Sequence, residues 1–346
     1  MKPSKTQITI AGKKLLSSKS SEERNDALEL INEWRTNHLH PLTLMKNSLL
    51  KILNKNKIEP VLVSQRLKRL TSIEYKLDLN KNMALGGMQD IGGYRVVLKD
   101  TKDLKKLKAL IEANKETKRY NLENCDDYVD SPKASGYRSI HYVYTYHSKV
   151  EKYDGMKIEL QIRTKLQHNW ATAVETGGIF TNTSLKSSKG PDDWLNFFKI
   201  VSSLFAIKEK LPVLNNHREF NMLQLMVECY NHTLKLNVIY ILKALRISAH
   251  QIEIEKIEGD YFIININFKD KVVNITVFQR RKYNAATEAY LKLEKNIKDN
   301  ESAVVLVSAN SFKSLKKAYP SYFLDTSEFI AALEKMNSNC KLWNLV

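Results

Sequence analysis

The most regular alternation of hydrophobic and polar positions lies in the middle of the chain, over residues 139–147 and 157–163. A period of two is typical of a strand with one buried face. Asp154-Gly155, between the two segments, predicts a hairpin turn. The polar positions on one face of the second segment are Glu159, Gln161 and Arg163. The pattern predicts a strand that presents a carboxylate, an amide and a guanidinium together, as a strand that lines a site does.

Helical spacing of apolar residues predicts helices on both sides of these strands. One helix begins at Ser21, which we expect to be its N-cap because acidic residues follow it. Residues 1–20 are expected to be loosely structured. Residues 58–63 are predicted to form an edge strand, since Pro60 cannot donate a ladder hydrogen bond. The further predicted helices span 41–54, 102–114, 165–176, 192–208 and 218–247, the last as one long helix or two shorter ones.

The pattern changes at about residue 251, where two strongly alternating segments, 261–268 and 271–278, predict a second hairpin. The elements expected after it are a buried strand at 303–307 and helices at 284–297, 311–318 and 326–336. We therefore predict two domains, residues 1–250 and a small α+β unit over 251–346. The second shows no catalytic constellation. Its one unusual feature is Tyr319-Pro320-Ser321-Tyr322, which a turn packed on its own domain would also explain.

Composition narrows the class of partner. The 346 residues carry a net charge of +17, from 55 Lys and Arg against 38 Asp and Glu. This charge favours an anionic partner, either nucleic acid or nucleotide phosphates. Charge that only solubilises the protein is the alternative. A hydrophobic content of 43% is that of a globular protein with a core.

The three cysteines, Cys125, Cys229 and Cys340, lie far apart in the sequence. Their spacing predicts neither a zinc site nor a disulfide framework, so we expect no zinc and a reducing, cytoplasmic location. The N-terminus has no apolar run of signal-peptide length. The most apolar later stretch, 236–247, contains Lys243 and Arg246 and is too short to span a bilayer, so no membrane partner is expected.

A basic run follows the first predicted strand. Its side chains converge if the chain passes from strand to helix near Thr71, and the helix N-terminus would then favour phosphate. The residues concerned are Arg66, Lys68, Ser72 and Lys76. A charge run is more often only a solvated face, so this pattern does not by itself establish a phosphate site.

Asp90 lies just before a strand predicted at 94–98, next to Gly92-Gly93, where the backbone is free to turn. A carboxylate at such a strand edge is a candidate magnesium ligand. A turn-forming aspartate is the alternative, and the local sequence alone favours it.

Taken in chain order, these blocks resemble the RelA/SpoT synthetase domain over roughly residues 60–176. The motifs that carry the resemblance are Arg66-x-Lys68…Ser72-Ile73…Lys76, Asp90-Ile91-x-Gly93-x-Arg95, Asp127-Tyr128…Pro132-Lys133-x-x-Gly136-Tyr137-x-Ser139-x-His141, Glu159-x-Gln161-Ile162-Arg163-Thr164 and Trp170-Ala171. The resemblance implies an α/β (α+β) fold, with a mixed, nucleotidyltransferase-like β-sheet flanked by helices. No HD-type hydrolase signature precedes the motifs.

The resemblance implies transfer of pyrophosphate from ATP, with Mg²⁺, to a ribose 3′-hydroxyl, releasing AMP. Such transfer depends on positioning and charge neutralisation, which the residues present could supply. By the family match, Asp90 and Glu159 would hold Mg²⁺, Glu159 would also orient or deprotonate the attacking hydroxyl, and Tyr137 would stack on the acceptor base. The residues expected to bind ATP are Arg66, Lys68, Ser72, Lys76 and Arg95. Those expected to support the acceptor and phosphates are Lys133, His141, Gln161 and Arg163; for His141, a purely structural role is about equally expected.

One segment departs from the family pattern. Alarmone synthetases continue Trp-Ala-x-x-Glu-His and then a basic Tyr-Lys segment, whereas this chain reads Trp-Ala-Thr-Ala-Val-Glu-Thr-Gly-Gly from Trp170. The departure fits better with toxic small alarmone synthetases that modify the 3′-CCA end of tRNA than with a GDP or GTP acceptor. The basic surface would then bind the tRNA backbone.

A synthetase followed by a small domain with Tyr-x-x-Tyr also resembles the fused CapRel-type toxin–antitoxin proteins of phage defence. This resemblance implies a pseudo-zinc-finger-like C-terminal domain whose Tyr319 and Tyr322 block the ATP pocket until a phage capsid protein binds. Two alternatives remain: a housekeeping synthetase that makes the (p)ppGpp alarmone from GDP or GTP, and a degenerate synthetase fold that only binds RNA. The motif residues Asp90, Tyr137 and Glu159 argue against the second alternative.

Overall fold

The structure is a computed structural model that describes residues 3–18, 20–114, 119–181, 183–249, 259–267, 272–296, 302–308 and 326–346. The described helices are α1 (Lys5–Ser17), α2 (Ser21–Asn37), α3 (Leu39–Lys55), α4 (Leu70–Leu79), α5 (Thr101–Glu112), α6 (Lys165–Phe180), α7 (Asp192–Glu209), α8 (Met222–Lys235), α9 (Val238–Ala249), α10 (Tyr283–Lys295) and α12 (Ser327–Leu342). The described strands are β1 (Leu62–Leu67), β2 (Gly92–Leu98), β3 (Tyr120–Asp127), β4 (Ile140–Tyr146), β5 (Met156–Thr164), β6 (Tyr261–Asn267), β7 (Val272–Phe278) and β8 (Ser302–Ser308).

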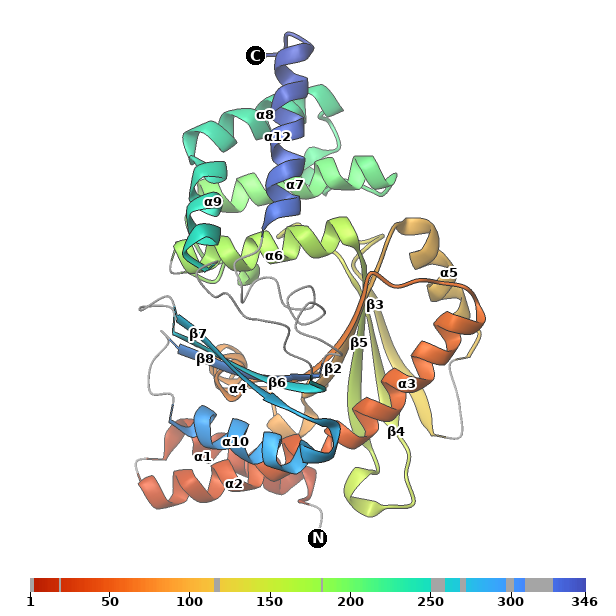
Figure 1. Ribbon diagram of the computed structural model, residues 1–346, viewed down its shortest axis with the longest axis vertical. Helices are drawn as coiled ribbons and strands as arrows, with labels where there is room; N and C mark the ends of the chain where they lie inside the picture. Colours follow the sequence, from red (N-terminus) through yellow and green to blue (C-terminus); the bar gives the residue numbers. More distant parts are fainter. Residues whose placement is uncertain are drawn as a thin grey trace.

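The described strands form one mixed sheet in the order β3-β4-β5-β2-β1-β8-β6-β7 (Figure 1). The β2–β5 pair is parallel, and the other neighbouring pairs are antiparallel. The predicted central hairpin is confirmed as β4 and β5, with His141 opposite Gln161 and Val143 opposite Glu159. Gly155 adopts a φ of +68° in the connection, where an L side chain would be strained. The expected mixed α+β architecture is thereby confirmed.

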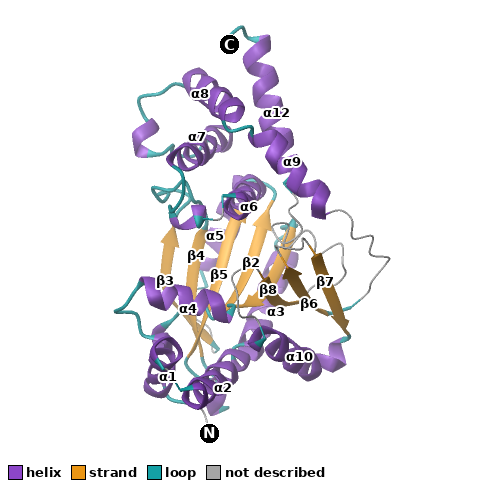
Figure 2. Ribbon diagram, turned by 90° about the vertical axis from the view of Figure 1, so that its left-hand side faces the viewer, coloured by secondary structure: helices purple, strands orange, loops and turns teal. Residues whose placement is uncertain are grey.

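Several groups of helices pack around the sheet (Figures 1 and 2), and α10 packs on β6, β7 and β8. Apolar side chains of α3 and α5 pack against β2, β4 and β5 and form one core. Helices α6, α7, α8, α9 and α12 share a second, aromatic core, and α1, α2 and α4 share a third. Within the described residues, no helix is long and apolar enough to cross a bilayer.

The expectation that residues 1–20 are loosely structured is wrong. Ser4 and Gln7 form a capping box at the start of α1, which satisfies backbone amides that would otherwise be orphaned. Ile8 and Leu15 are fully buried in the core with α2 and α4. At the start of α2, Ser20 rather than Ser21 is the N-cap, and its Oγ accepts a hydrogen bond from the Glu23 amide.

The predicted edge strand at 58–63 is also misplaced. β1 begins at Leu62 and lies inside the sheet, between β2 and β8. Pro60 precedes the strand, so it removes no ladder hydrogen bond, and Ile58 packs into the α3–α5 core. The shift moves Arg66 from the expected strand-to-helix connection into β1 itself.

The elements after residue 258, which we call the C-terminal segment, contact two distant parts of the fold. β8 pairs with β1 at Gln65–Ser308 and Arg66–Val307, which joins β6, β7 and β8 to the same sheet. α12 instead buries Phe329 against the aromatic core of α6 and α7, 6.1 Å from the ring centre of Phe198. The division at residue 250 stays a prediction, as does a pseudo-zinc-finger-like domain. The helix expected at 311–318 lies outside the described residues.

Candidate active site

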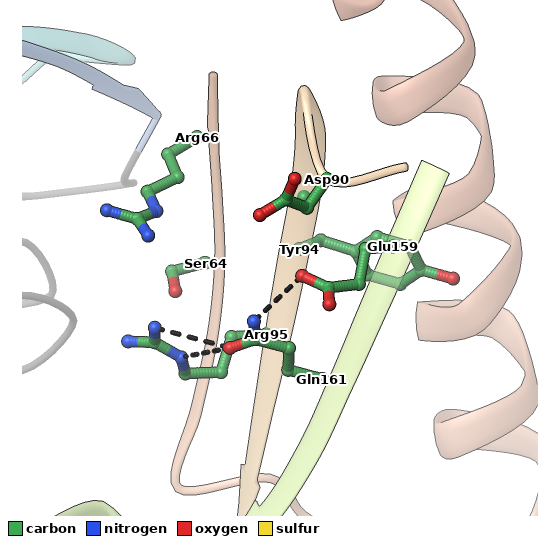
Figure 3. A pocket seen from close by; sticks show the side chains of 8 residues that line it. Ser64, Arg66, Asp90, Tyr94, Arg95, Glu159 and Gln161 are labelled. Carbon is green, nitrogen blue, oxygen red and sulfur yellow. Dashed lines mark hydrogen bonds between the residues drawn. The ribbon is translucent and has the colours of Figure 1, made fainter. Parts of the chain in front are cut away.

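Side chains from three neighbouring strands, β1, β2 and β5, line a pocket on the sheet. β1 contributes Ser64 and Arg66, β2 contributes Arg95, and β5 contributes Glu159 and Gln161. Asp90, just before β2, lines it as well. Figure 3 shows the carboxylates of Asp90 and Glu159 pointing into one space, with the guanidinium groups of Arg66 and Arg95 across from them. The pocket therefore contains carboxylates and guanidinium groups side by side, because the parallel pairing of β2 with β5 places Arg95 and Glu159 on neighbouring strands.

Two lysines hold the Asp90 carboxylate. Lys68 Nζ lies 2.6 Å from Oδ2, and Lys76 Nζ, from α4, lies 3.1 Å from Oδ1. Burial alone would raise the pKa of Asp90, but Lys68 and Lys76 outweigh it and hold the value at about 2. Asp90 is therefore a permanent anion at neutral pH, and three predicted site residues meet at one point.

His141 holds the other carboxylate. Its Nδ1 lies 2.9 Å from Glu159 Oε1, and its Nε2 lies 2.9 Å from the hydroxyl of Tyr137. Burial lowers the pKa of His141, but Tyr137 and Glu159 outweigh it and raise the value to about 9. Burial likewise raises the pKa of Glu159, yet the contacts with His141 bring it below its ordinary value. Glu159 is thus an ionised carboxylate aimed into the pocket.

Gln161 connects Glu159 to the cationic side of the pocket. Its Nε2 donates to Glu159 Oε2 at 2.8 Å, and its Oε1 accepts from Arg95 Nε and an Nη at 3.4 Å each (Figure 3). These bonds set the amide orientation, because only one flip satisfies both neighbours. Gln161 therefore fixes the positions of a carboxylate and a guanidinium at once.

An adjoining pocket shares four of these side chains and extends toward the loop before β4. Its other lining residues include Asp126, Tyr128, Lys133, Tyr137 and His141, together with residues 83, 84 and 87–89. Gly136 shapes the loop: its φ is +92°, and a Cβ there would lie 2.9 Å from Ser202 Cβ. Ser202 Oγ donates to the Gly136 carbonyl at 2.6 Å. The loop is thereby tied to α7, with Lys133 and Tyr137 at the pocket.

Tyr128 is a lining residue that was not among the predicted site residues. Lys133 Nζ lies 4.3 Å from the centre of its ring, and the ring packs edge-on against Tyr137 and His141. The only sequence signal was its place in the Asp127-Tyr128 motif. Tyr137 itself is only 7% exposed, so Tyr128 supplies the more accessible aromatic surface of this pocket.

Two predicted site residues do not line these pockets. Arg163 is 3% exposed and bonds His168 Nδ1 on α6, so the helix covers it. Ser72 lies in the first turn of α4, which begins at Leu70, and is not among the lining residues. Tyr319 and Tyr322 lie outside the described residues.

The donor set fits a magnesium ion that binds together with a nucleotide. In the described part of the chain no group of three His, Cys, Asp or Glu could hold a metal alone. Mg²⁺, however, commonly uses one or two carboxylates plus substrate phosphates and water. Asp90 and Glu159 are both ionised, and the charge of Asp90 acts to raise the pKa of Glu159, a repulsion that a shared dication would relieve.

Comparisons with known proteins agree with the position of this site. Residues 65–181 match a family model described as a region found in RelA / SpoT proteins. A GTP pyrophosphokinase of Haemophilus influenzae is 29% identical over 148 residues, 43% of this chain and 18% of that protein. The GTP pyrophosphokinase YjbM of Bacillus subtilis is 35% identical over 88 residues, 25% of this chain and 39% of that protein. The matches thus span well under half of either relative.

One similar solved structure is that of small alarmone synthetase 1 from Bacillus subtilis bound to its product pppGpp. It is 24% identical, with a TM-score of 0.43, and the match covers 50% of this chain and 89% of that one. Small alarmone synthetase 2 from the same organism is 19% identical, with a TM-score of 0.44 over 51% of this chain and 92% of that one.

Proposed function

We propose that this chain, which contains a RelA/SpoT-type synthetase domain at residues 65–181, is an ATP-dependent pyrophosphokinase. The observation that carries the proposal is the pair of ionised carboxylates, Asp90 and Glu159, facing Arg66 and Arg95 in one pocket. Transfer of a phosphoryl-type group needs charge neutralisation and in-line positioning more than covalent catalysis. A pocket with both signs of charge can bind the phosphates and activate a hydroxyl.

Glu159 is the proposed general base. Its carboxylate accepts the proton of the acceptor 3′-hydroxyl, whose oxygen forms a bond to the β-phosphorus of ATP. The bond from that phosphorus to the α–β bridging oxygen breaks, and AMP leaves with the electron pair. His141 and Gln161 orient the carboxylate, since each bonds a different oxygen. Mg²⁺, held by Asp90 and Glu159, would neutralise phosphate charge.

The cations around the pocket are the proposed ATP-binding groups. Arg66 and Arg95 face the carboxylates, and Lys68 and Lys76 contact Asp90. We propose that triphosphate oxygens take over part of the lysine contacts when the nucleotide and its cation bind. Ser72 contributes from the first turn of α4, where a helix N-terminus favours an anion and where the Leu70 amide already bonds the Glu294 carboxylate.

For the acceptor we propose the 3′-CCA end of tRNA, so that the reaction, carried out in the cytoplasm, inhibits translation. The net charge of +17 supports a polyanionic partner. The last turn of α6 contains no basic residue that could hold nucleotide phosphates. It is also closely packed, since Thr176 is fully buried and a Cβ on Gly178 would lie 2.8 Å from the Thr183 carbonyl. GDP or GTP is the second candidate, which the names of the relatives favour.

We further propose that the C-terminal segment restrains this activity until a phage protein such as capsid binds. Ser308, where β8 ends, lies opposite Gln65, between the pocket residues Ser64 and Arg66. β8 therefore ends next to the strand that carries Ser64 and Arg66. This supports a role for Tyr319 and Tyr322, which follow β8 in the sequence, in covering the ATP site.

The test uses γ-³²P-labelled ATP with full-length protein, offered tRNA in one reaction and GDP plus GTP in another. We expect label on tRNA that is lost when the CCA end is removed. Glu159→Gln should lower the rate by about 10²- to 10⁴-fold, whereas Glu151→Gln, an exposed carboxylate outside the pocket, should not. Label on guanosine nucleotides would reassign the acceptor, and undiminished transfer by Glu159→Gln would refute the proposed base.

Restraint is tested in the same assay with Tyr319→Ala/Tyr322→Ala, which leaves the described contacts of the C-terminal segment intact. A rise in basal transfer is the expected result. An unchanged rate in a variant of unaltered thermal stability would contradict the occlusion proposal without affecting the proposed chemistry.

A further inference from the structure

A fully buried ion pair joins the C-terminal segment to the N-terminal helices. Arg35 of α2 and Glu294 of α10 are 259 positions apart in sequence, yet Arg35 Nη1 lies 2.7 Å from Glu294 Oε2. The exposed fractions of the two side chains are 0% and 4%. Figures 1 and 2 both show α10 running beside α2.

The pair also clamps the turn between β1 and α4. Arg35 donates to the Lys68 carbonyl from Nη2 at 2.8 Å and from Nε at 3.2 Å. Glu294 Oε1 accepts from the Leu70 amide at 2.7 Å, and this amide is the first of α4. Both ends of the Lys68–Leu70 turn are therefore fixed by one guanidinium and one carboxylate.

Tyr290 completes the cluster. Its hydroxyl donates to Glu294 Oε1 at 2.7 Å and accepts from Arg35 Nη2 at 2.7 Å. Burial works against the charge on Arg35, but Tyr290 and Glu294 outweigh it and raise the pKa of the guanidinium above its ordinary value. A buried network of this kind is rigid, because a shift of any member leaves another group unsatisfied.

The clamped turn carries the cationic side of the candidate active site. Lys68 reaches Asp90 with its side chain, and its backbone amide donates to the Ile91 carbonyl at 2.8 Å. α4, which starts at the clamped amide, brings Lys76 to the same carboxylate. A displacement of the turn would therefore move both lysines relative to Asp90.

We propose that Glu294 is a positioning residue for ATP, because its carboxylate, held by Arg35, fixes the turn that carries Lys68 and the start of α4. This inference rests on the proposed function, since ATP is the ligand that the lysines would meet. α10 is then part of the support of the ATP site. Removing the C-terminal segment would weaken ATP binding even where it also relieves occlusion.

The test compares full-length wild type with the double variant Arg35→Met/Glu294→Met. Replacing both charges leaves no orphan ion, and two methionine side chains fill a similar volume at the buried contact. The measurements are the Kd of a non-hydrolysable ATP analogue with Mg²⁺ by calorimetry, the KM for the acceptor, and the melting temperature. Glu288→Gln, an exposed carboxylate on the same helix, is the matched control, and Tyr290→Phe is a milder variant that keeps both charges.

We expect the Kd of the analogue to rise about tenfold in the double variant, with an unchanged acceptor KM. The melting temperature should fall less than in Arg35→Met, because the Lys68 carbonyl, the Leu70 amide and the Tyr290 hydroxyl lose partners but no ion is stranded. Tyr290→Phe should raise the Kd less, and Glu288→Gln not at all. An unchanged Kd in the folded double variant would overturn the inference, as would tighter binding. If wild type fails to bind the analogue, the proposed function fails, a result distinct from a loss confined to the variants.

Discussion

Arg35 and Arg163 are both buried arginines, but their partners differ in kind. Arg35 bonds a carboxylate, a hydroxyl and a backbone carbonyl. Arg163 bonds the imidazole of His168, and the Nε of Arg163 has no hydrogen-bond partner among the described residues. Burial and then Arg95 lower the pKa of Arg163 to about 9, whereas the pKa of Arg35 lies above its ordinary value.

Arg35 stabilises the fold through a buried carboxylate, whereas Arg163 has no such partner and is available to interact with a bound anion. The counter-ion of Arg35 is part of the protein, so folding satisfies it. Burial, Arg95 and Arg66 lower the pKa of Arg163, and together they outweigh Tyr137 and Glu175, which raise it, so the protein compensates the charge of Arg163 only in part and an excess of positive charge remains. A bound polyphosphate would relieve such an excess, which is how an anion site gains affinity.

Arg35→Met should have the largest effect, because it strands the Glu294 carboxylate in the interior. We expect the free energy of unfolding to fall by about 3–5 kcal/mol, measured by urea denaturation. Lys243→Met is the control, since the Lys243–Glu334 pair is 52% and 46% exposed; it should cost about 1 kcal/mol or less. Equal losses in the two variants would remove the distinction between buried and exposed pairs.

Arg163→Met should give the opposite pattern. No buried carboxylate hydrogen-bonds Arg163 within the described residues, and Glu175, whose charge favours the cation, is only half-buried. We therefore expect stability to fall much less than in Arg35→Met. Pyrophosphate transfer should nevertheless fall by about 10²-fold, because one cation behind the phosphates is lost. The measurements are urea denaturation and the labelled-ATP assay. A stability loss as large as that of Arg35→Met would contradict the comparison.

Much of the site could be predicted because it lies on period-two strands. Alternation along β5 placed Glu159 and Gln161 on one face, and the structure brings both into the pocket. For Arg163 the same alternation gives the face of the strand but not what covers it, and here α6 does. The aromatic Tyr128 was missed because its loop has no period.

The long-range contacts could not be predicted from local pattern. Nothing near Arg35 or Glu294 in the sequence indicates a partner 259 positions away. The pairing of β8 with β1 is of the same kind. Residues 58–63 were placed at an edge because of Pro60, and local pattern could not reveal that the neighbour that makes β1 an interior strand lies more than 200 residues later in the sequence. α1 was missed because its few buried positions lie among basic and polar residues.

Binding of a polyphosphate tests directly whether Arg163, unlike Arg35, interacts with a bound anion. A non-hydrolysable ATP analogue with Mg²⁺, at about 100 times its Kd, should stabilise the wild type by about 2.7 kcal/mol. The gain should be smaller in Arg163→Met, since part of the charge that the phosphates neutralise is gone. The matched control, Lys243→Met, changes a cation remote from the pocket and should show the full gain, as thermal denaturation with and without analogue can establish. An equal gain in both variants would exclude Arg163 from phosphate binding.

Two histidines, His141 and His217, show the same contrast between a side chain with a carboxylate partner and one without. His141 bonds Glu159, and its pKa is raised to about 9. His217, between α7 and α8, bonds the hydroxyl of Ser203 at 2.9 Å instead. Burial and then Lys199 lower the pKa of His217. As with the arginines, the cation is favoured where a carboxylate is the partner.

The depressed pKa of His217 predicts a loss of stability in acid. The unfolded chain binds the proton more readily than the folded protein, so the contribution is present at neutral pH and is lost as the pH falls through the ordinary histidine value of about 6.5. One proton limits the slope to about 1.4 kcal/mol per pH unit. His217→Gln, which retains a polar group for Ser203, should flatten the urea-denaturation profile between pH 7 and 5.5, whereas the exposed His147→Gln should not. A profile that His217→Gln leaves as steep as wild type would show that the lost stability comes from other groups.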